Sequence, residues 1–456
     1  MLNVVILAAG KGTRMLSDLP KVLAPIGARP LLYHVIKTAS QLTELPPTVI
    51  VGHGADQVKQ QFPQDVNYVE QQQQLGTGHA VMQALPHIQD DATVLILCGD
   101  VPLIRAQTLS RLVEPVNDET MALLTIVLDD PTGYGRILRD HNNNVVGIVE
   151  QKDATDEQSK INEVNTGVMA VKGSQLKRWL PMLSNDNAQQ EYYLTDIIAI
   201  ANACSTAIAT EQAEYPWEVQ GINNRLQLAQ LEREYQRLNA EEVMNKGVTL
   251  YDPQRFDCRG NLTVGRDVII DINCIFEGEV SLGNNVTIGP NVVIKDSVIG
   301  DNTTVLANSV IDKSNVASQC NIGPYARLRP GTVLSQGAKV GNFVETKKAV
   351  IGTNSKINHL SYVGDAQLGN DVNVGAGTIT CNYDGANKWE TIVGNDVFIG
   401  SNSALVAPVT LKDGSTIGAG STINRDVDED ELVITRVNQR HIKSWKRPEK
   451  NSEPKD

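Results

Sequence analysis

The chain has 456 residues, of which 20% are charged, and its net charge is −13 with a pI near 5.1. This acidic balance, without a basic stretch before the C-terminal tail, argues against a protein that binds duplex nucleic acid. No window approaches the roughly 18 apolar residues of a membrane span, and the N-terminus lacks the basic segment of a signal peptide. The six cysteines form no C-x-x-C pair, which is typical of a reducing cytoplasm.

The chain begins with an apolar run over residues 3–8 that leads into the loop Leu7-Ala8-Ala9-Gly10-Lys11-Gly12-Thr13-Arg14-Met15. An apolar helical stretch follows at 30–42. Small residues let backbone N–H groups reach phosphate oxygens, and Lys11 and Arg14 add positive charge. The third glycine of a dinucleotide-binding loop and the Walker lysine are both absent. The loop alone is therefore also compatible with a surface connection between a strand and a helix.

Further apolar runs at 47–52, 93–98, 122–128 and 164–171 alternate with helical stretches, which predicts a doubly wound α/β domain. Asp100 follows one of these runs directly. A carboxylate at the carboxyl end of a parallel strand lies where such sheets bind ligands. Asp100 and the amide oxygen of Asn223 would suffice to hold Mg²⁺ beside phosphates. The alternative is an aspartate that caps the next turn.

The segment 226–247 places Leu228, Leu231, Tyr235 and Leu238 on one helical face and ends at Gly247. We interpret it as a linker helix. It separates a domain over residues 1–225 from a second domain over 248–437, and a polar tail over 438–456 follows. We expect the two domains to be separable, with a first fragment ending near Gln227 and a second starting near Gly247.

From about Leu262 to Ile423 the sequence repeats every six residues, a period that fits neither a helix nor a plain strand. Reading every sixth position gives Leu262, Val268, Cys274, Val280, Val286, Val292, Val298, Thr304, Val310, Val316, Ile322, Leu328, Leu334 and Val340. Aliphatic-glycine pairs recur 18 residues apart, as in Val264-Gly265 and Leu282-Gly283. Three six-residue sides make one turn of a three-sided parallel β-helix, so these positions are predicted to face inward. The repeat slips near Lys347–His359 and again at Cys381–Lys388.

The N-terminal loop continues into Leu19-Pro20-Lys21, and together these motifs resemble the sugar-nucleotide pyrophosphorylases. More motifs follow in the order of that family: Gln71, Leu75-Gly76-Thr77-Gly78, Cys98-Gly99-Asp100, Gly133-Tyr134-Gly135-Arg136, Glu150, Asn165-Thr166-Gly167 and Asn223. One departure is Cys98, because many relatives carry an aromatic residue there. The repeat in turn resembles the left-handed β-helix of the hexapeptide-repeat acyltransferases, which implies a homotrimer with acyl sites between neighbouring prisms.

The fusion of the two, together with Arg329-Pro330-Gly331, Glu345-Thr346-Lys347-Lys348 and the segment from His359 to Asp365, resembles one bacterial family. Its members are the bifunctional UDP-N-acetylglucosamine pyrophosphorylases/glucosamine-1-phosphate N-acetyltransferases. The resemblance implies that acetyl-CoA acetylates glucosamine 1-phosphate and that UTP then converts the product to UDP-N-acetylglucosamine and pyrophosphate, with Mg²⁺. The alternative is a nucleotidyltransferase alone, whose β-helix serves only to oligomerise.

The resemblance also implies the roles of individual residues. Arg14 and Lys21 would act in uridylyl transfer. The nucleotide and its sugar would be bound by Leu7, Ala8, Ala9, Gly10, Lys21, Gln71, Gly76, Thr77, Cys98, Gly99, Asp100, Gly135, Glu150, Asn165 and Asn223. Gln71, Gly76 and Thr77 would hold uracil and ribose, and Gly135, Glu150 and Asn165 the sugar.

In the second domain, the resemblance implies that His359 is the general base of acetyl transfer, since imidazole titrates near neutral pH. The alternative for a single histidine is a structural, hydrogen-bonded residue. Glucosamine 1-phosphate would be bound by Arg329, Lys347, Tyr362 and Asn373, and acetyl-CoA by Ala376, Asn382, Tyr383, Ser401, Ala419 and Arg436. Asn382 and Ser401 would stabilise the oxyanion.

Overall fold

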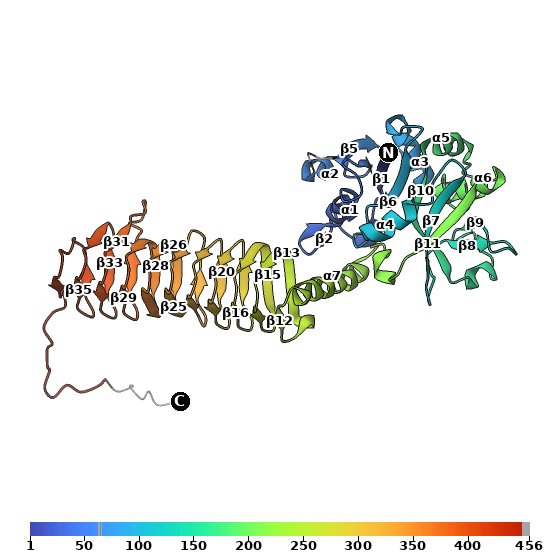
Figure 1. Ribbon diagram of the computed structural model, residues 1–456. Helices are drawn as coiled ribbons and strands as arrows, with labels where there is room; N and C mark the ends of the chain where they lie inside the picture. Colours follow the sequence, from blue (N-terminus) through green and yellow to red (C-terminus); the bar gives the residue numbers. More distant parts are fainter. Residues whose placement is uncertain (63, 65, 449–456) are drawn as a thin grey trace, which may run out of the picture. The chain divides into compact units, whose positions relative to one another are not determined.

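The computed structural model describes residues 1–62, 64 and 66–448. The chain divides into two compact units, Met1–Asn239 and a second unit from Ala240 onward (Figure 1). Among the described residues, no helix is long and apolar enough to cross a membrane. The described part of the tail, residues 438–448, is exposed and contains neither helix nor strand. The rest of the predicted polar tail, 449–456, lies outside the described residues.

The first unit is built on one sheet with strand order β11-β7-β10-β6-β1-β4-β5, to which the β8–β9 hairpin is added. All strands along this path run parallel except β10, which is antiparallel to both of its neighbours. The strands are β1 (Leu2–Ala8), β4 (Thr48–Val51), β5 (Asn67–Glu70), β6 (Thr93–Cys98), β7 (Thr120–Val127), β8 (Arg136–Arg139), β9 (Val145–Val149), β10 (Glu163–Lys172) and β11 (Ala207–Gln212). β2 (Pro25–Ile26) and β3 (Arg29–Pro30) form a separate hairpin.

Helices cover both faces of this sheet, because its central strands are apolar on both sides. Alternate residues of β1 enter different cores: Ile6 packs with α1, α2 and α4, whereas Val5 packs with α3, α5 and α6. The helices are α1 (Leu31–Ala39), α2 (Ala55–Gln61), α3 (Thr77–Ala84), α4 (Ala106–Val113), α5 (Gly173–Trp179) and α6 (Ile197–Ala203). This three-layer arrangement confirms the prediction of a doubly wound α/β unit.

The helix α7 (Arg225–Asn245) joins the two units and contributes to the core of each. In the first unit, Leu231 is 1% exposed and packs with Met15, Ile26 and Ile222. On the same helix, a Glu232 Oε atom accepts a 2.8 Å hydrogen bond from the backbone N–H of Gly27. Further along, Ala240 and Val243 belong to the core of the second unit. A fragment that ends near Gln227 would therefore lose part of its own core.

The second unit is a parallel β-helix, as predicted: every strand of its coils pairs in parallel with the strand one coil away (Figure 1). One face consists of β12 (Thr249–Leu250), β14 (Ile269–Ile270), β16 (Thr287–Ile288), β19 (Thr304–Val305), β22 (Asn321–Ile322), β25 (Lys339–Asn342), β27 (Lys356–His359), β29 (Asn373–Val374), β32 (Phe398–Ile399), β35 (Thr416–Ile417) and β37 (Leu432–Val433).

The other two faces share one sheet, because its longer strands continue around the corner between them. These faces consist of β13 (Phe256–Val264), β15 (Cys274–Leu282), β17 (Val293–Lys295), β18 (Val298–Ile299), β20 (Val310–Asp312), β21 (Asn315–Val316), β23 (Arg327–Leu328), β24 (Val333–Leu334), β26 (Glu345–Ile351), β28 (Tyr362–Leu368), β30 (Ile379–Cys381), β31 (Thr391–Val393), β33 (Ala404–Val406), β34 (Val409–Leu411) and β36 (Thr422–Ile423).

The strict six-residue register was wrong over three of the predicted inward positions. Val298 is 49% exposed, Val310 is 39% exposed and Thr304 is half-buried, whereas the next residue in each case is buried. The reason is that two sides have five residues instead of six, so that inward positions run from 294 to 299 and from 311 to 316. After each five-residue side, the buried positions therefore come one residue earlier than a strict six-residue repeat predicts.

We predict that the packed face of α7 stabilises the first unit. Replacing a buried leucine by alanine usually costs about 2–5 kcal/mol. Leu231→Ala should therefore lower the free energy of unfolding of this unit by about 2–4 kcal/mol. Urea unfolding of the full chain, followed by tryptophan fluorescence, measures this, because the buried Trp179 reports on this unit.

The matched control is Leu226→Ala on the same helix, where the side chain is 68% exposed and little should change. Equal effects of the two substitutions would contradict the packing described for α7.

Candidate active sites

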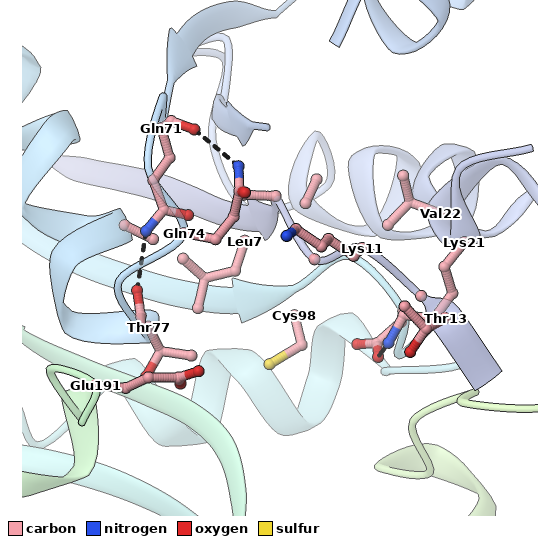
Figure 2. Close-up of a pocket in the computed structure, with 17 residues that line it drawn as sticks. Leu7, Lys11, Thr13, Lys21, Val22, Gln71, Gln74, Thr77, Cys98 and Glu191 are labelled. Carbon is pink, nitrogen blue, oxygen red and sulfur yellow. Dashed lines mark hydrogen bonds and ion pairs between the residues drawn. The ribbon is translucent and has the colours of Figure 1, made fainter. Parts of the chain in front are cut away.

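The first candidate site is a cleft of about 570 Å³ at the carboxyl ends of β1 and β6, with the segment after β5 on one side (Figure 2). Such sheets bind ligands at this edge. Its lining includes these predicted residues: Leu7, Ala8, Ala9, Gly10, Lys21, Gln71, Gly76, Thr77, Cys98 and Asp100. Lys11, Thr13, Gln74 and Glu191 also line it. The predicted Arg14, Gly99, Gly135, Glu150, Asn165 and Asn223 are not part of this lining.

The glycine-rich loop after β1 needs a glycine at position 12. Gly12 has φ +60°, and a Cβ there would lie 2.7 Å from the Cβ of Lys21. Both conditions disfavour any larger residue. The loop can therefore close against Lys21, whose side chain also lines the cleft.

Four predicted residues from distant parts of the chain meet in one polar cluster. Lys21 Nζ lies 2.5 Å from Asp100 Oδ2 and 3.2 Å from Asn223 Oδ1. Arg14 donates to the same Asn223 oxygen at 2.9 Å. The backbone N–H of Ile222 donates to the carbonyl oxygen of Asp100 at 3.0 Å, which fixes the two segments side by side.

The cluster fits the predicted Mg²⁺ because its donor set already faces a cation. Asp100 Oδ2 and Asn223 Oδ1 both accept from one ammonium group, so both oxygens point to a shared position. Carboxylate and amide oxygens are ligands that Mg²⁺ prefers, and two of them suffice beside phosphates and water. Among the described residues, no group of three or more His, Cys, Asp or Glu side chains forms an all-protein metal site.

On the opposite side of the cleft, the backbone around Gly76 fits only glycine. A Cβ at Gly76 would lie 2.6 Å from the carbonyl oxygen of Tyr192. The buried side chain of Gln71 donates through Nε2 to the carbonyl oxygen of Gly76 at 3.0 Å (Figure 2). Gln71 and Gly76 are therefore held together, as expected for residues with a common ligand.

The residues predicted to hold the sugar lie on β8, β9 and β10 and on their connections. The backbone N–H of Asn165 donates to the carbonyl oxygen of Gly135 at 2.9 Å, and the Asn165 side chain accepts from Gly167 at 3.1 Å. A Cβ at Gly135 would come within 3.4 Å of Glu150 Oε1. Burial raises the pKa of Glu150, although Thr195 donates to its carboxylate at 3.1 Å.

The structure shows why Cys98 is unsuited to act as a nucleophile. Burial, with a smaller contribution from the charge of Asp100, raises the pKa of the Cys98 thiol to about 12. The reactive form of cysteine is the thiolate, which is scarce at neutral pH under these conditions. Cys98 therefore shapes the cleft next to Gly167, whose carbonyl oxygen lies 3.8 Å from Sγ.

The second candidate site is on the β-helix. It lies at the corner that the chain reaches at the end of each strand of the first face. His359 ends β27, and its Nδ1 lies 2.6 Å from Oδ1 of Asn342, the equivalent residue one coil earlier. The imidazole itself is exposed. Since Asn342 Oδ1 is an acceptor, Nδ1 carries the proton and Nε2 keeps its lone pair.

Small side chains continue this corner beyond His359. The backbone N–H of Gly377 bonds to the carbonyl oxygen of His359, that of Asn402 to Ala376, and that of Gly420 to Ser401. His359, Ala376, Ser401 and Ala419 thus take the same place on consecutive coils. Arg436 donates to the carbonyl oxygen of Ala419 at 2.8 Å. Three of the predicted acetyl-CoA residues, Ala376, Ser401 and Ala419, therefore lie in one row that starts at His359, and Arg436 contacts its end.

The predicted sugar-phosphate residues lie mainly on the adjacent face. Arg329 Nη1 pairs with Glu345 Oε1 at 2.8 Å, and Tyr362 is opposite Glu345 on the next coil. The hydrogen-bonding contact and like charge of Lys347 lower the pKa of Lys388. Asn373 lies on β29, opposite Lys356 of β27.

The insertion after β30 contains the remaining predicted residues. Asn382 is buried and its amide donates to the carboxylate of Asp365, whereas Tyr383 is exposed and donates to the carbonyl oxygen of Gly385 at 2.6 Å. Lys388, which belongs to this loop, contacts Lys347.

Sequence reasoning missed three residues that the structure brings into the candidate sites: His79 beside Gln71, Asn342 beside His359 and Lys388 beside Lys347. Asn342 and His359 are 17 residues apart, which is one coil when a side has five residues. A count of 17 in the repeat would have found this pair. No comparable spacing in the sequence indicates His79 or Lys388.

Comparison with family models identifies the class of each unit. Residues 4–142 match the MobA-like NTP transferase domain, residues 258–344 match the GMPPB C-terminal domain, and residues 390–425 match six repeats of the bacterial transferase hexapeptide. The chain is thus a nucleotidyltransferase fused to a left-handed hexapeptide β-helix. A nucleotidyl transferase from Methanothermobacter thermautotroptrophicus aligns over 52% of this chain and 99% of its own, with 18% identity and a TM-score of 0.40.

Relatives match over almost the entire chain. The bifunctional protein GlmU of Cellvibrio japonicus is 62% identical over 99% of this chain and 100% of its own length. Its namesakes from Saccharophagus degradans and Marinobacter nauticus are 60% and 59% identical, over 99% and 98% of this chain and 100% and 99% of their own. The chain belongs to the family of bifunctional GlmU proteins. This confirms the family and the bifunctional transferase predicted from the motifs.

Two carboxylates near the sugar side of the first site should respond oppositely to pH. Burial raises the pKa of Glu150, so its ionised form opposes folding above the ordinary glutamate pKa, and this penalty disappears below that value. Arg139 lowers the pKa of Glu163, so this group stabilises the fold above the ordinary pKa and loses that effect as the pH falls through its folded pKa. Glu150→Gln should therefore stabilise the protein at about pH 8, and Glu163→Gln should destabilise it.

Urea unfolding between about pH 4 and pH 8 measures both effects, and each variant is the other's control. Both differences from wild type should shrink toward acidic pH. Equal changes of the same sign in the free energy of unfolding would contradict a Glu150 that opposes folding and a Glu163 that stabilises it.

Proposed function

We propose that the chain makes UDP-N-acetylglucosamine in two steps at two separate sites. The β-helix transfers an acetyl group from acetyl-CoA to the amine of glucosamine 1-phosphate. The first unit then transfers the uridylyl group of UTP to N-acetylglucosamine 1-phosphate and releases pyrophosphate. The observation that carries this proposal is that one chain of this family contains both the Lys21–Asp100–Asn223 cluster and the His359–Asn342 pair.

In uridylyl transfer, a phosphate oxygen of the sugar phosphate forms a bond to the α-phosphorus of UTP. The bond from that phosphorus to the bridging oxygen breaks, and pyrophosphate leaves. An in-line displacement of this kind needs alignment and charge neutralisation rather than a protein nucleophile. Arg14 and Lys21 would supply positive charge at the phosphates, while N–H groups of the glycine-rich loop donate to their oxygens.

Mg²⁺ would be held by Asp100 and Asn223, and it would neutralise phosphate charge during the reaction. Lys21 now pairs with both oxygens, so we infer that its ammonium group turns toward the phosphates when they bind. Gln71, Gly76 and Thr77 would hold the nucleoside, and Gly135, Glu150 and Asn165 would hold the sugar.

In acetyl transfer, the amine of glucosamine 1-phosphate attacks the thioester carbonyl, the C–S bond breaks, and coenzyme A leaves as its thiol. Nε2 of His359 would take the proton from the amine, and the Asn342 contact at Nδ1 leaves that lone pair available. Arg329 and Lys347 would bind the phosphate, and Tyr362 and Asn373 would orient the ring.

The row from Ala376 to Ala419 would accommodate coenzyme A because its members are small. Tyr383 and Arg436 would bind the same ligand. Asn382 and Ser401 would donate hydrogen bonds to the oxyanion of the tetrahedral intermediate.

We infer a homotrimer in which the acetyl site is completed by a neighbouring β-helix. Bulky apolar residues at successive corners support this, since Tyr325, Phe343 and Leu360 are exposed, and the rings of the first two stack at 5.3 Å. Exposed apolar groups in one row favour burial against another chain. We place the enzyme in the cytoplasm, where its six free cysteines would stay reduced.

Asp100→Ala should abolish uridylyl transfer, because it removes a ligand of the proposed Mg²⁺ and the partner of Lys21. The loss should exceed about 10²-fold, since such charge stabilisation is worth several kcal/mol. Pyrophosphate release measures this step, and acetyl transfer should stay near wild type. Asp129→Ala, at an exposed carboxylate of the same unit, is the control. Normal uridylyl turnover in Asp100→Ala would rule out the role.

His359→Ala should lower the kcat of acetyl transfer by about 10²–10⁴-fold, the usual contribution of a positioned general base. Its side chain is exposed, so the melting temperature and uridylyl transfer should hardly change. Release of free thiol from acetyl-CoA measures the first step, and the exposed His441→Ala serves as control. A lower melting temperature with little loss of turnover would instead show a structural histidine.

A further inference from the structure

His79 on α3 contacts the buried side chain of Gln71 at the edge of the nucleotide cleft. Its Nδ1 lies 3.0 Å from Gln71 Nε2, and the same Nε2 lies 3.0 Å from the carbonyl oxygen of Gly76. Gln71 is 3% exposed and lines the cleft, whereas His79 is not in its lining. His79 can therefore act on a ligand only through Gln71.

These contacts determine where the nitrogen and the oxygen of the Gln71 amide lie. The carbonyl oxygen of Gly76 can only accept, so the group beside it must be the amide NH₂. Its second N–H then points to His79 Nδ1, which must be unprotonated to accept it. Rotating the amide by half a turn would place its oxygen against the oxygen of Gly76 and against the lone pair of His79.

The contact of His79 with Gln83 is compatible with this arrangement. Gln83 Nε2 lies 3.2 Å from His79 Nε2 and donates to the His79 carbonyl oxygen at 3.1 Å. A neutral imidazole has one acceptor nitrogen, so it cannot accept from both glutamines. Gln83 is only half-buried, so water can pair with its second N–H, whereas Gln71 is buried and an unpaired N–H there would cost more. Nδ1 is therefore the acceptor.

With both of its N–H groups engaged, Gln71 has only its oxygen Oε1 left for a ligand. In the part of the chain that the structure describes, Oε1 has no hydrogen-bond partner and is not among the fully buried unpaired atoms. A lone acceptor at this position recognises a donor on the ligand. Uracil and thymine carry a donor, N3–H, on the edge where cytosine carries an acceptor, N3.

We propose that His79 is a positioning residue that makes the first site select uracil over cytosine, by holding the Gln71 amide with its oxygen toward the base. This inference rests on the proposed uridylyl transfer and adds to it the residue that sets base selectivity. It also implies that this contact does not distinguish uracil from thymine, because both present N3–H.

The test compares kcat/KM for UTP and CTP in the full-length chain. His79→Phe keeps an aromatic ring beside Tyr192 but removes the acceptor, so that Gly76 alone still orients the Gln71 amide and the turned amide becomes more populated. The UTP/CTP ratio should fall by about tenfold, mostly through a higher KM for UTP with kcat little changed. His79→Asn retains an acceptor near the position of Nδ1 and should keep most of the wild-type ratio. His87→Ala, at an exposed histidine just after α3, should change nothing.

An unchanged UTP/CTP ratio in His79→Phe would overturn the inference, and so would an equal loss with both nucleotides, which indicates a merely structural role. Wild-type protein with UTP methylated at N3 gives a second measurement that does not depend on a variant folding. Its kcat/KM should be far lower than that of UTP, and an equal kcat/KM would also overturn the inference. A wild-type protein inactive with UTP would refute the proposed function itself, which is a distinguishable result.

Discussion

The β-helix depends on its corners, where the chain must turn after each short strand. At many corners a residue other than glycine has positive φ, as at Asn291, Asn308 and Leu360. Most coils close after 17 or 18 residues, and the coil with the insertion after β30 closes after 25. Equivalent residues of consecutive coils therefore bond to each other and form rows. His359 and the small residues after it belong to one such row. The site that we propose for acetyl transfer thus depends on coil length, because one residue more or less on a side would move His359 off the row of Asn342.

The first unit brings its site together by a different constraint, the convergence of parallel strands at one edge of a sheet. Asp100 follows β6 and Lys21 follows the loop after β1, while Asn223 comes from far along the chain. The ion pair between Lys21 and Asp100 holds these segments around the position where phosphates and their metal would lie. The Lys21 ammonium group lies between two oxygens, Asp100 Oδ2 and Asn223 Oδ1. Neither site shares a residue with the other, which is consistent with two successive reactions in one chain.

Much of this could be predicted from the sequence, because fold and motifs depend on local patterns. The alternation of apolar runs with helices predicted the first unit, and the six-residue period predicted the β-helix. The period failed at Val298 and Val310, since a five-residue side has no strong signature in a run of aliphatic residues. The motifs indicated Gln71 and His359 but not their partners, His79 and Asn342. Asn342 could have been found by counting one coil of 17 residues back from His359. His79 could not, because its contact with Gln71 depends on side-chain direction, which only the structure supplies.

The most direct test is to follow the two reactions in one sample, with phosphates measured by ³¹P NMR and the free thiol of coenzyme A measured in aliquots with a thiol reagent. Full-length protein would receive glucosamine 1-phosphate, UTP and Mg²⁺, first without and then with acetyl-CoA. We expect almost no nucleotide sugar at first. Once acetyl-CoA is added, free thiol should appear, followed by UDP-N-acetylglucosamine and pyrophosphate together. Rapid formation of a UDP-sugar without acetyl-CoA, or acetyl transfer without any later nucleotide sugar, would contradict the proposed function.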